Sequence, residues 1–311
     1  MEKPSPYYFR HGGADDLDNL LPCGLAPQSC PVCSSTSQLL FCGGCKVVSY
    51  CGKAHQLTDR PNHKAVCITI KKTGEKLDRE EAELRAKPAD SLLPADVFNT
   101  SAGRFWGILD TRNYMRARFA AADALLKVET RVAVERALGH FMEMLRLCRA
   151  DNLGVRDVVP ALLLRLGREQ ECYDFLKWWA TADLDGKYRW GDTTLPYLDV
   201  HGADAFEPIE PFLPNHGLSL SQLAMLTLLK LRLRLDLESH GSESGRPVGR
   251  LVRAKVRFAH TRGISRTTEE LKSQYYTLCR VINDANPHFW EALVNGETPS
   301  PPASYGVGSR E

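Results

Sequence analysis

The chain has 311 residues, of which 43% are hydrophobic and 25% are charged, and its formal net charge is +2. This near-neutral balance disfavours direct nucleic-acid or lipid binding, because no global field attracts phosphate groups. The N-terminus lacks the apolar stretch of a signal peptide, and no window approaches the roughly 18 apolar residues of a membrane span. We therefore expect a cytoplasmic or nuclear protein that is not secreted, in which clustered cysteines bind metal more often than they form disulfides.

An irregular segment is expected over residues 1–29, followed by a cluster of cysteines and histidines over residues 30–67. The pattern is C-x2-C-x8-C-x2-C-x5-C-x3-H-x7-H-x3-C. Its eight candidate ligands fall into four pairs: Cys30/Cys33, Cys42/Cys45, Cys51/His55 and His63/Cys67. A structural zinc takes four nitrogen or sulfur ligands, so eight ligands fit two closed sites. Cys23 lies outside the pattern and is not expected to bind metal.

Each pair has a spacing that can hold two ligands at one point. The Cys-x2-Cys pairs predict short turns, and we expect Gly43 and Gly44 to supply unusual backbone angles in the second turn. The other pairs are spaced i,i+4, which puts both side chains on one face of a helix. Spacing alone leaves open which turn joins which helix. The apolar core of so short a segment is too small to stabilise it, whereas zinc binding, worth about 10–16 kcal/mol in finger peptides, can do so.

The strings CPVC, FCGGC, YCGKAHQ and NHKAVC resemble a MYND-type zinc finger. In that family the two sites interleave, and His55 stands where the family usually has cysteine. The resemblance implies two structural zincs held by these sets: Cys30, Cys33, Cys51 and His55 for zinc 1, and Cys42, Cys45, His63 and Cys67 for zinc 2.

MYND fingers bind proline-containing segments of partner proteins. Their groove carries a glutamine, matched here by Gln56, and a tryptophan, at whose position this chain has Arg60. These two residues are the candidate peptide contacts. Partner preference is expected to differ from that of MYND fingers that carry the tryptophan.

The rest of the chain is predicted to be mostly helical. Residues 68–104 are expected to hold a solvated, charged helix over Lys71–Arg85 and then a loop. An α-helical, repeat-like domain is predicted over residues 105–296 and a disordered tail over 297–311. The individual helices are expected at 113–128, 131–148 (capped by Thr130), 153–167 (with Pro160 kinking it or shortening its first turn, and Gly167 at its end), 168–183, 219–239 and 266–285. Two of these pairs match at an offset of about 38 residues and resemble tetratricopeptide-type hairpins.

The segment Tyr188–Gly217 is rich in proline, glycine and aspartate and is too long for a plain connection. Its residues Asp192, Asp199, His201 and Asp204 could suggest a metal or acid–base site, but their spacing fits turn capping better. The aromatic residues between Tyr173 and Trp190 could line a ligand groove, although core packing is the favoured interpretation.

The fold class we predict is mostly α, with a small two-zinc, cross-braced MYND-like finger before a helical hairpin domain. This order resembles fungal MYND-finger proteins. The expected function is a zinc-binding protein–protein interaction adaptor with no catalytic residues of its own. One alternative is a MYND-associated methyltransferase, whose SET motifs the chain lacks, and another is a nucleic-acid-binding regulator. No phosphate loop, nucleophile elbow or dinucleotide fingerprint is present.

Overall fold

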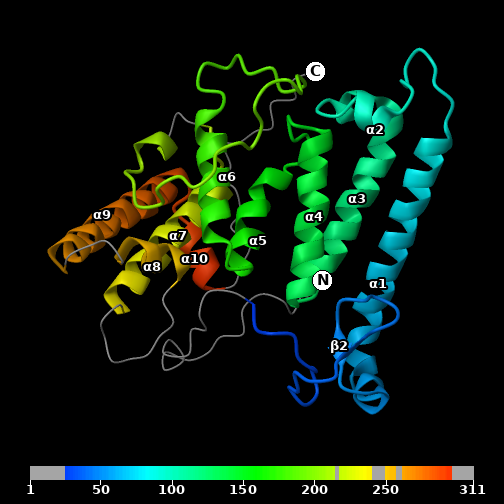
Figure 1. Ribbon diagram of the computed structural model, residues 1–311, viewed down its shortest axis with the longest axis horizontal. Helices are drawn as coiled ribbons and strands as arrows, with labels where there is room; N and C mark the ends of the chain where they lie inside the picture. The colour runs from blue at the N-terminus through cyan, green and yellow to red at the C-terminus, as the bar shows by residue number, and fades with distance from the viewer. Residues whose placement is uncertain (1–24, 214–216, 240–248, 257–260, 296–311) are drawn as a thin grey trace. The chain divides into compact units, whose positions relative to one another are not determined.

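A computed structural model describes residues 25–213, 217–239, 249–256 and 261–295. Cys23, most of the predicted N-terminal segment and the predicted tail lie outside the described residues. The described chain is mostly helical and begins with the small finger, which confirms the predicted fold class (Figure 1). No helix in the described ranges has both the length and the apolar character needed to cross a membrane. The domain limits expected from the sequence stay predictions.

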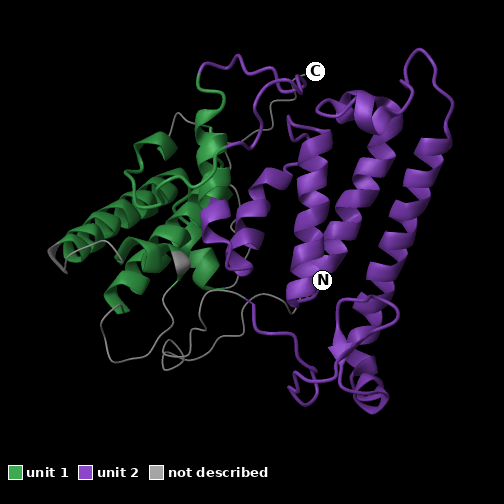
Figure 2. Cartoon of the chain, in the orientation of Figure 1, with its two compact units in different colours: residues 1–22, 173–184, 200–311 green, residues 23–172, 185–199 purple. Residues whose placement is uncertain are grey.

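The chain forms two compact units, coloured separately in Figure 2. Unit 2 covers residues 23–172 and 185–199, and unit 1 covers residues 1–22, 173–184 and 200–311. The elements, in chain order, are β1 (Leu40–Phe41), β2 (Ser49–Tyr50), α1 (Lys53–Ala86), α2 (Val97–Thr100), α3 (Arg112–Leu126), α4 (Arg131–Leu147), α5 (Val159–Arg165), α6 (Glu169–Thr181), α7 (Leu220–Ser239), α8 (Arg250–Val256), α9 (Thr261–Ala285) and α10 (Phe289–Val294).

Helix α1 joins the finger to the rest of unit 2. It begins inside the finger at Lys53 and continues without a break to Ala86. The expected solvated helix is therefore only part of a longer one, and it is not solvated on every side: Ile70, Leu77 and Leu84 are buried at a seven-residue spacing. This apolar line packs against α3. Lys87 leaves the helix in an extended conformation because it precedes a proline.

Helices α1, α3 and α4 lie side by side in unit 2 (Figure 1). The predicted cap of α4 is confirmed, since the Thr130 side chain accepts a hydrogen bond from the N–H of Ala133 at 3.2 Å. One face of α4 is apolar and buried, and it consists of Val134, Leu138, Phe141, Leu145 and Cys148. At the far end of α1, Arg85 lies over the ring of Phe98, which packs on Phe105 and Tyr114.

Helix α5 is shorter than predicted. Residues 155–157 form a 3-10 turn, and α5 starts at Val159 with Pro160 in its first turn, where the missing N–H costs no helix hydrogen bond. Of the two outcomes expected for Pro160, the shortened first turn is therefore the correct one. Gly167 follows the helix with a φ of 69°, as its predicted C-cap role requires. Residues 97–100, predicted as loop, form the single-turn helix α2.

In unit 1, α7 packs against α9. The helix predicted over 219–239 is confirmed, with leucines at 223, 226, 229, 233 and 237 buried. Lys230 of α7 is fully buried, and its Nζ donates hydrogen bonds to the carbonyl oxygens of Ala205 and Glu207, at 2.8 and 2.9 Å. The Glu207 carboxylate accepts hydrogen bonds from Tyr173 and Lys177. These contacts anchor the irregular segment after residue 199 to α6 and α7.

Two aspartates of the Tyr188–Gly217 segment behave as predicted. Asp192 accepts hydrogen bonds from the backbone and hydroxyl of Thr194, and Asp204 accepts one from the N–H of Phe206. Turn capping is therefore confirmed for both. The favoured core interpretation of the aromatic run is also confirmed for its helical part, since Tyr173, Phe175, Trp178 and Trp179 of α6 are buried.

Candidate metal centre

Two turns with the same backbone geometry carry the Cys-x2-Cys pairs. In the first, the N–H of Ser34 donates to the carbonyl oxygen of Cys30 at 2.8 Å, and in the second the N–H of Lys46 donates to that of Cys42 at 2.9 Å. Ser34 and Lys46 have φ values of 58° and 56°. Each residue therefore takes the left-handed conformation directly after the second cysteine, which closes the turn and directs both thiols to one side.

The prediction that Gly43 and Gly44 supply unusual angles is wrong, because neither has a positive φ. Gly44 is needed for space instead. A Cβ atom added at Gly44 would lie 2.7 Å from Cys67 Sγ, whereas one at Gly43 would meet nothing within 4 Å. The backbone of the second turn therefore approaches the helical ligand so closely that a side chain at Gly44 would displace it.

The other four ligand residues lie at the start of α1 or directly before it. His55, His63 and Cys67 belong to the helix, and Cys51 lies between the end of β2 and the first residue of α1. Tyr50 of β2 fixes this junction, since its hydroxyl donates to Asp59 at 2.7 Å and its ring meets the ring of His63 edge-on. The predicted helical pair is therefore confirmed for His63 and Cys67, whereas the prediction is wrong for the other pair, because Cys51 lies two residues before the helix that carries His55.

The eight residues form two groups, and within each group all four ligand atoms lie within 4.8 Å of one another. The groups have the interleaved composition that the resemblance implies: Cys30, Cys33, Cys51 and His55 in site 1, and Cys42, Cys45, His63 and Cys67 in site 2. His55 presents Nδ1 and His63 presents Nε2 to the neighbouring thiols.

The distances within the groups fit zinc. A tetrahedral ion with bonds of about 2.3 Å to sulfur holds two sulfurs about 3.8 Å apart. Cys42 Sγ and Cys67 Sγ are 3.7 Å apart, and Cys33 Sγ and Cys51 Sγ are 3.5 Å apart. Four ligands leave no open position, so each bound zinc cross-links the fold rather than activating water.

Electrostatics give a second reason for a cation. In site 1, hydrogen bonding to Cys33 raises the pKa of Cys51 to about 11. The pKa of Cys30 falls to about 6, because backbone N–H groups that stabilise its thiolate outweigh its burial. Site 2 shows the same division: burial raises the pKa of Cys67 to about 11, while backbone hydrogen bonds outweigh burial and lower that of Cys42 to about 6. Adjacent thiolates repel one another, and a divalent cation removes the conflict by deprotonating them together.

The two sites differ in exposure. All four ligands of site 2 are buried, with Cys42 4%, Cys45 3%, His63 6% and Cys67 5% exposed. In site 1 only Cys30 is buried, whereas Cys51 and His55 are half-buried and Cys33 is exposed. Site 2 therefore lies in the core of the finger, and site 1 lies at its surface.

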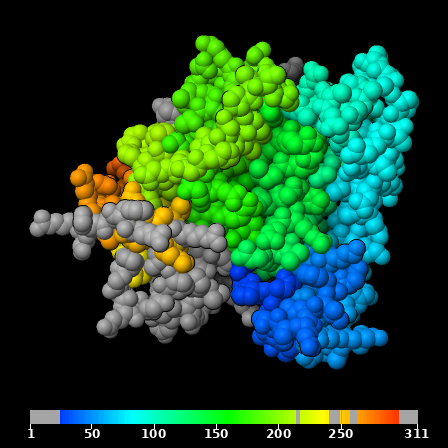
Figure 3. All heavy atoms as spheres, in the orientation of Figure 1, coloured from blue at the N-terminus to red at the C-terminus, as the bar shows by residue number. Residues whose placement is uncertain are grey.

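In the described part of the chain, hydrogen bonds and a shared helix attach the finger to the helices of unit 2. The hydroxyl of Thr130 donates to the carbonyl oxygen of Val47 at 2.8 Å, and in the segment just before the finger the N–H of Leu25 donates to the carbonyl oxygen of Arg165 at 2.8 Å. Helix α1 itself is a further attachment. In the space-filling view the blue atoms of the finger lie directly against the green helices of this unit (Figure 3). None of these attachments was predicted from the sequence.

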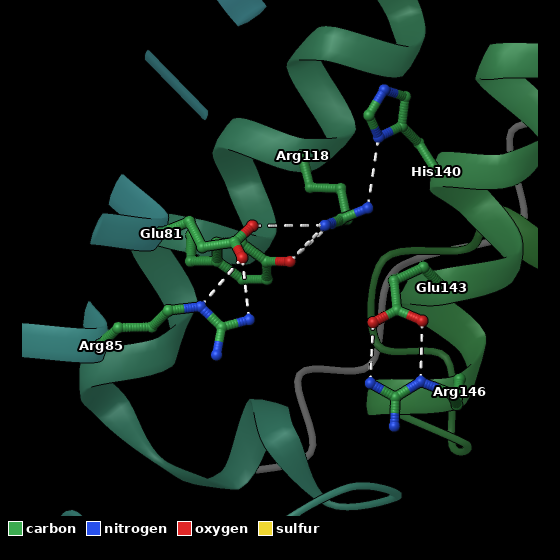
Figure 4. A network of polar contacts seen from close by, with 7 residues as sticks. Glu81, Arg85, Arg118, His140, Glu143 and Arg146 are labelled. Atoms are coloured by element: carbon green, nitrogen blue, oxygen red, sulfur yellow. Dashed lines mark hydrogen bonds and ion pairs between the residues drawn. The ribbon is translucent and has the colours of Figure 1, made fainter. Parts of the chain in front are cut away.

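A polar network holds the distal half of α1 to α3 and α4 (Figure 4). Arg118 of α3 is its centre: it donates to the Tyr114 hydroxyl, contacts Glu81 of α1 at 3.7 Å and donates to Nδ1 of His140 of α4 at 3.3 Å. Burial and the nearby Arg118 lower the pKa of His140 to about 4, so the ring is neutral and can accept this bond. The network thus joins three helices through one guanidinium.

The candidate peptide contacts lie one turn apart on α1. Gln56 is half-buried and Arg60 is exposed. Arg60 is part of an exposed helical stripe that was not predicted from the sequence: Lys53, Leu57, Arg60, Lys64, Ile68 and Lys71. Their spacing of three and four residues was the available signal. We call this set the basic stripe.

Comparison with known proteins places the finger in a family. Residues 30–67 match the family model of the MYND finger. A stretch of 71 residues is 37% identical to the Rho GTPase-activating protein gacZ of Dictyostelium discoideum, and it covers 23% of this chain but only 6% of that protein. No solved structure matches the chain. Residues 30–67 are therefore a MYND zinc finger with two Cys/His metal sites.

Proposed function

We propose that this protein is an adaptor that binds protein partners through its MYND finger, with the helices of unit 2 as the scaffold. The observation that carries the proposal is the basic stripe, which combines exposed cations with the exposed aliphatic side chains of Leu57 and Ile68, 61% and 39% exposed. Exposed cations and single exposed apolar side chains are each ordinary on a helix, and we take their combination on a MYND finger as the interaction surface.

The chemistry of the stripe indicates its partner. Four cations favour an acidic segment, and Leu57 and Ile68 favour apolar residues within it. The MYND resemblance adds proline-containing peptides, and Arg60 replaces the apolar wall on which a proline would stack. We therefore infer a preference for proline-containing segments that also carry acidic and aliphatic residues. Leu40 and Phe41 of β1, 70% and 53% exposed, add apolar surface on the same finger.

Several finer parts of this proposal rest on the sequence. The helical hairpin α3–α4 and the sequence offset of about 38 residues support tetratricopeptide-like repeats. The order of finger and helices supports a likeness to fungal MYND-finger proteins. The adaptor acts without catalysis of its own, in the reducing cytoplasm or nucleus, where cysteine clusters keep zinc. The GTPase-activating function named for the relative is not carried over, because the match covers 6% of that protein.

The test measures the binding of fluorescent peptides to the full-length, zinc-loaded chain by polarisation. One peptide contains proline, aspartate and leucine, and its control replaces each aspartate by asparagine. We expect tighter binding of the acidic peptide, weakening with salt, and on the order of tenfold loss in the double variant Leu57→Ser/Arg60→Glu. Leu92→Ser/Arg79→Glu is the matched control, because both residues are exposed on unit 2 outside the finger. Equal binding of both peptides, or tighter binding of a DNA or RNA oligonucleotide, would contradict the proposal.

A further inference from the structure

The two metal sites of the finger differ in a property that decides how they respond to oxidants. Cysteine oxidation depends on thiolate character and on access. All six cysteine ligands are thiolates when zinc is bound, so access separates them. Among the cysteines in the described ranges, Cys33 alone is exposed. The site 2 cysteines are all at most 5% exposed, and Cys30 is fully buried.

The nearest partner of the Cys33 sulfur is suited to completing a disulfide. Cys51 Sγ lies 3.5 Å from Cys33 Sγ, across the gap between the first Cys-x2-Cys turn and the start of α1. Cys51 is itself half-buried, in the irregular residues between β2 and α1. A bond between these sulfurs would keep the cross-link that zinc 1 provides between the turn and the helix, while removing two of the four ligands of site 1.

We propose that site 1 is a redox-sensitive site at which a peroxide converts Cys33 and Cys51 into a disulfide and zinc 1 is lost, while site 2 keeps its ion. The Cys33 thiolate attacks one oxygen of hydrogen peroxide, which breaks the O–O bond, forms a sulfenic acid and releases hydroxide. The Cys51 thiolate then attacks the Cys33 sulfur, forms the S–S bond and expels a second hydroxide. The two sulfurs together lose two electrons and the peroxide oxygens gain two, so the step is balanced.

Local structure explains why the change stops at site 1. Cys30 and His55 cannot hold zinc by themselves, since a structural site uses four ligands. Site 2 is shielded by the second turn, whose Gly44 backbone leaves no room beside Cys67 Sγ. Val47, which lies in the loop after that turn, is fully buried and bound to Thr130. The structural change caused by oxidation therefore extends to the first turn of α1 and leaves the attachment of the finger to the helices of unit 2 intact.

The experiment treats the full-length chain, loaded with two zincs, with increasing hydrogen peroxide. Native mass spectrometry counts the zincs, and peptide mapping locates disulfides. We expect a species that holds one zinc and a Cys33–Cys51 disulfide. This species should form at least about tenfold faster than the species without zinc. A reductant with added zinc should restore the chain to two zincs. Loss of both zincs together, first loss from site 2, or a first disulfide between any other pair would overturn the proposal.

Two variants sharpen this test without replacing the wild-type result. Cys33→His keeps four ligands of types that zinc accepts and removes the attacking sulfur, so peroxide should release zinc 1 at least about tenfold more slowly. Cys279→Ala removes a half-buried thiol outside the finger and should leave the release rate unchanged. A Cys33→His chain that binds two zincs and loses one as fast as the wild type would also overturn the proposal.

Discussion

The hydroxyl of Thr130 is hydrogen-bonded to the carbonyl oxygen of Val47 at 2.8 Å, although the two residues are 83 positions apart. The same hydroxyl accepts the hydrogen bond of Ala133 N–H that caps α4. A single side chain therefore begins a scaffold helix and holds the loop that follows the second zinc turn. The finger is consequently part of unit 2 rather than a separate domain on a flexible linker.

Thr130→Val tests this double role. Valine has the same shape but no hydroxyl, so both hydrogen bonds are lost and the buried carbonyl of Val47 is left without this partner. We expect a loss of about 1–3 kcal/mol in the free energy of unfolding, measured in urea, with two zincs retained. Thr130→Ser keeps the hydroxyl and should lose less than half as much. Equal losses in the two variants would show that the hydroxyl is not responsible.

Gly44→Ala and Gly43→Ala are a matched pair in the second zinc turn. The added methyl group at Gly44 would meet Cys67 Sγ at 2.7 Å, whereas at Gly43 it meets open space. Overpacking of this kind costs about 1–3 kcal/mol, so Gly44→Ala should weaken zinc 2 by roughly tenfold or more in competition with a chelator. Gly43→Ala should bind zinc like the wild type. Similar affinities for both variants would contradict the close approach.

Arg118→Met removes the centre of the polar network between α1, α3 and α4. It leaves His140 and Tyr114 without their shared donor, so we expect a loss of about 1–3 kcal/mol in stability. It also removes a positive charge beside His140, whose pKa should rise from about 4 toward its ordinary 6.5, as followed by NMR titration. Arg146→Met is the control, because Arg146 pairs with Glu143 at the surface and should cost under about 1 kcal/mol. An unchanged His140 pKa would contradict the network.

Lys230 predicts a pH dependence of stability. Burial lowers its pKa from 10.5 to about 7. Between those values the unfolded chain binds a proton that the folded chain has released, so stability rises with pH across this window. Lys230→Met abolishes that slope and leaves two carbonyl oxygens without their donor. Urea unfolding at pH 6, 8 and 9.5 should therefore show that the free energy of unfolding of the wild type increases relative to that of the variant as pH rises. The increase should total a few kcal/mol, at about 1.4 kcal/mol per pH unit. Parallel profiles would show that Lys230 titrates normally in the folded state.

The finger was more predictable than its attachment. Eight ligands in four pairs follow from spacing. Which Cys-x2-Cys turn shares an ion with which i,i+4 pair followed only from the family resemblance, because an i,i+4 pair can face either turn. The continuity of α1 was missed because charged residues dominate 71–85 and because Pro61, which the helix accommodates without a break, is a residue that ordinarily ends one. The spacing of His63, Cys67, Ile70, Leu77 and Leu84 was a helical signal present in the sequence. The bond from Thr130 to Val47 had no local signal, since it depends on how distant segments pack.

Zinc counting in double variants tests the interleaved sites most directly. Cys30→Ser/Cys51→Ser removes two ligands of site 1 only, so native mass spectrometry of the full-length chain should find one zinc per molecule. Cys30→Ser/Cys42→Ser removes one ligand from each site and should leave no tightly bound zinc. A sequential arrangement, with both turns on one ion and both helical pairs on the other, reverses the two results. One zinc in the second variant and none in the first would therefore contradict the account.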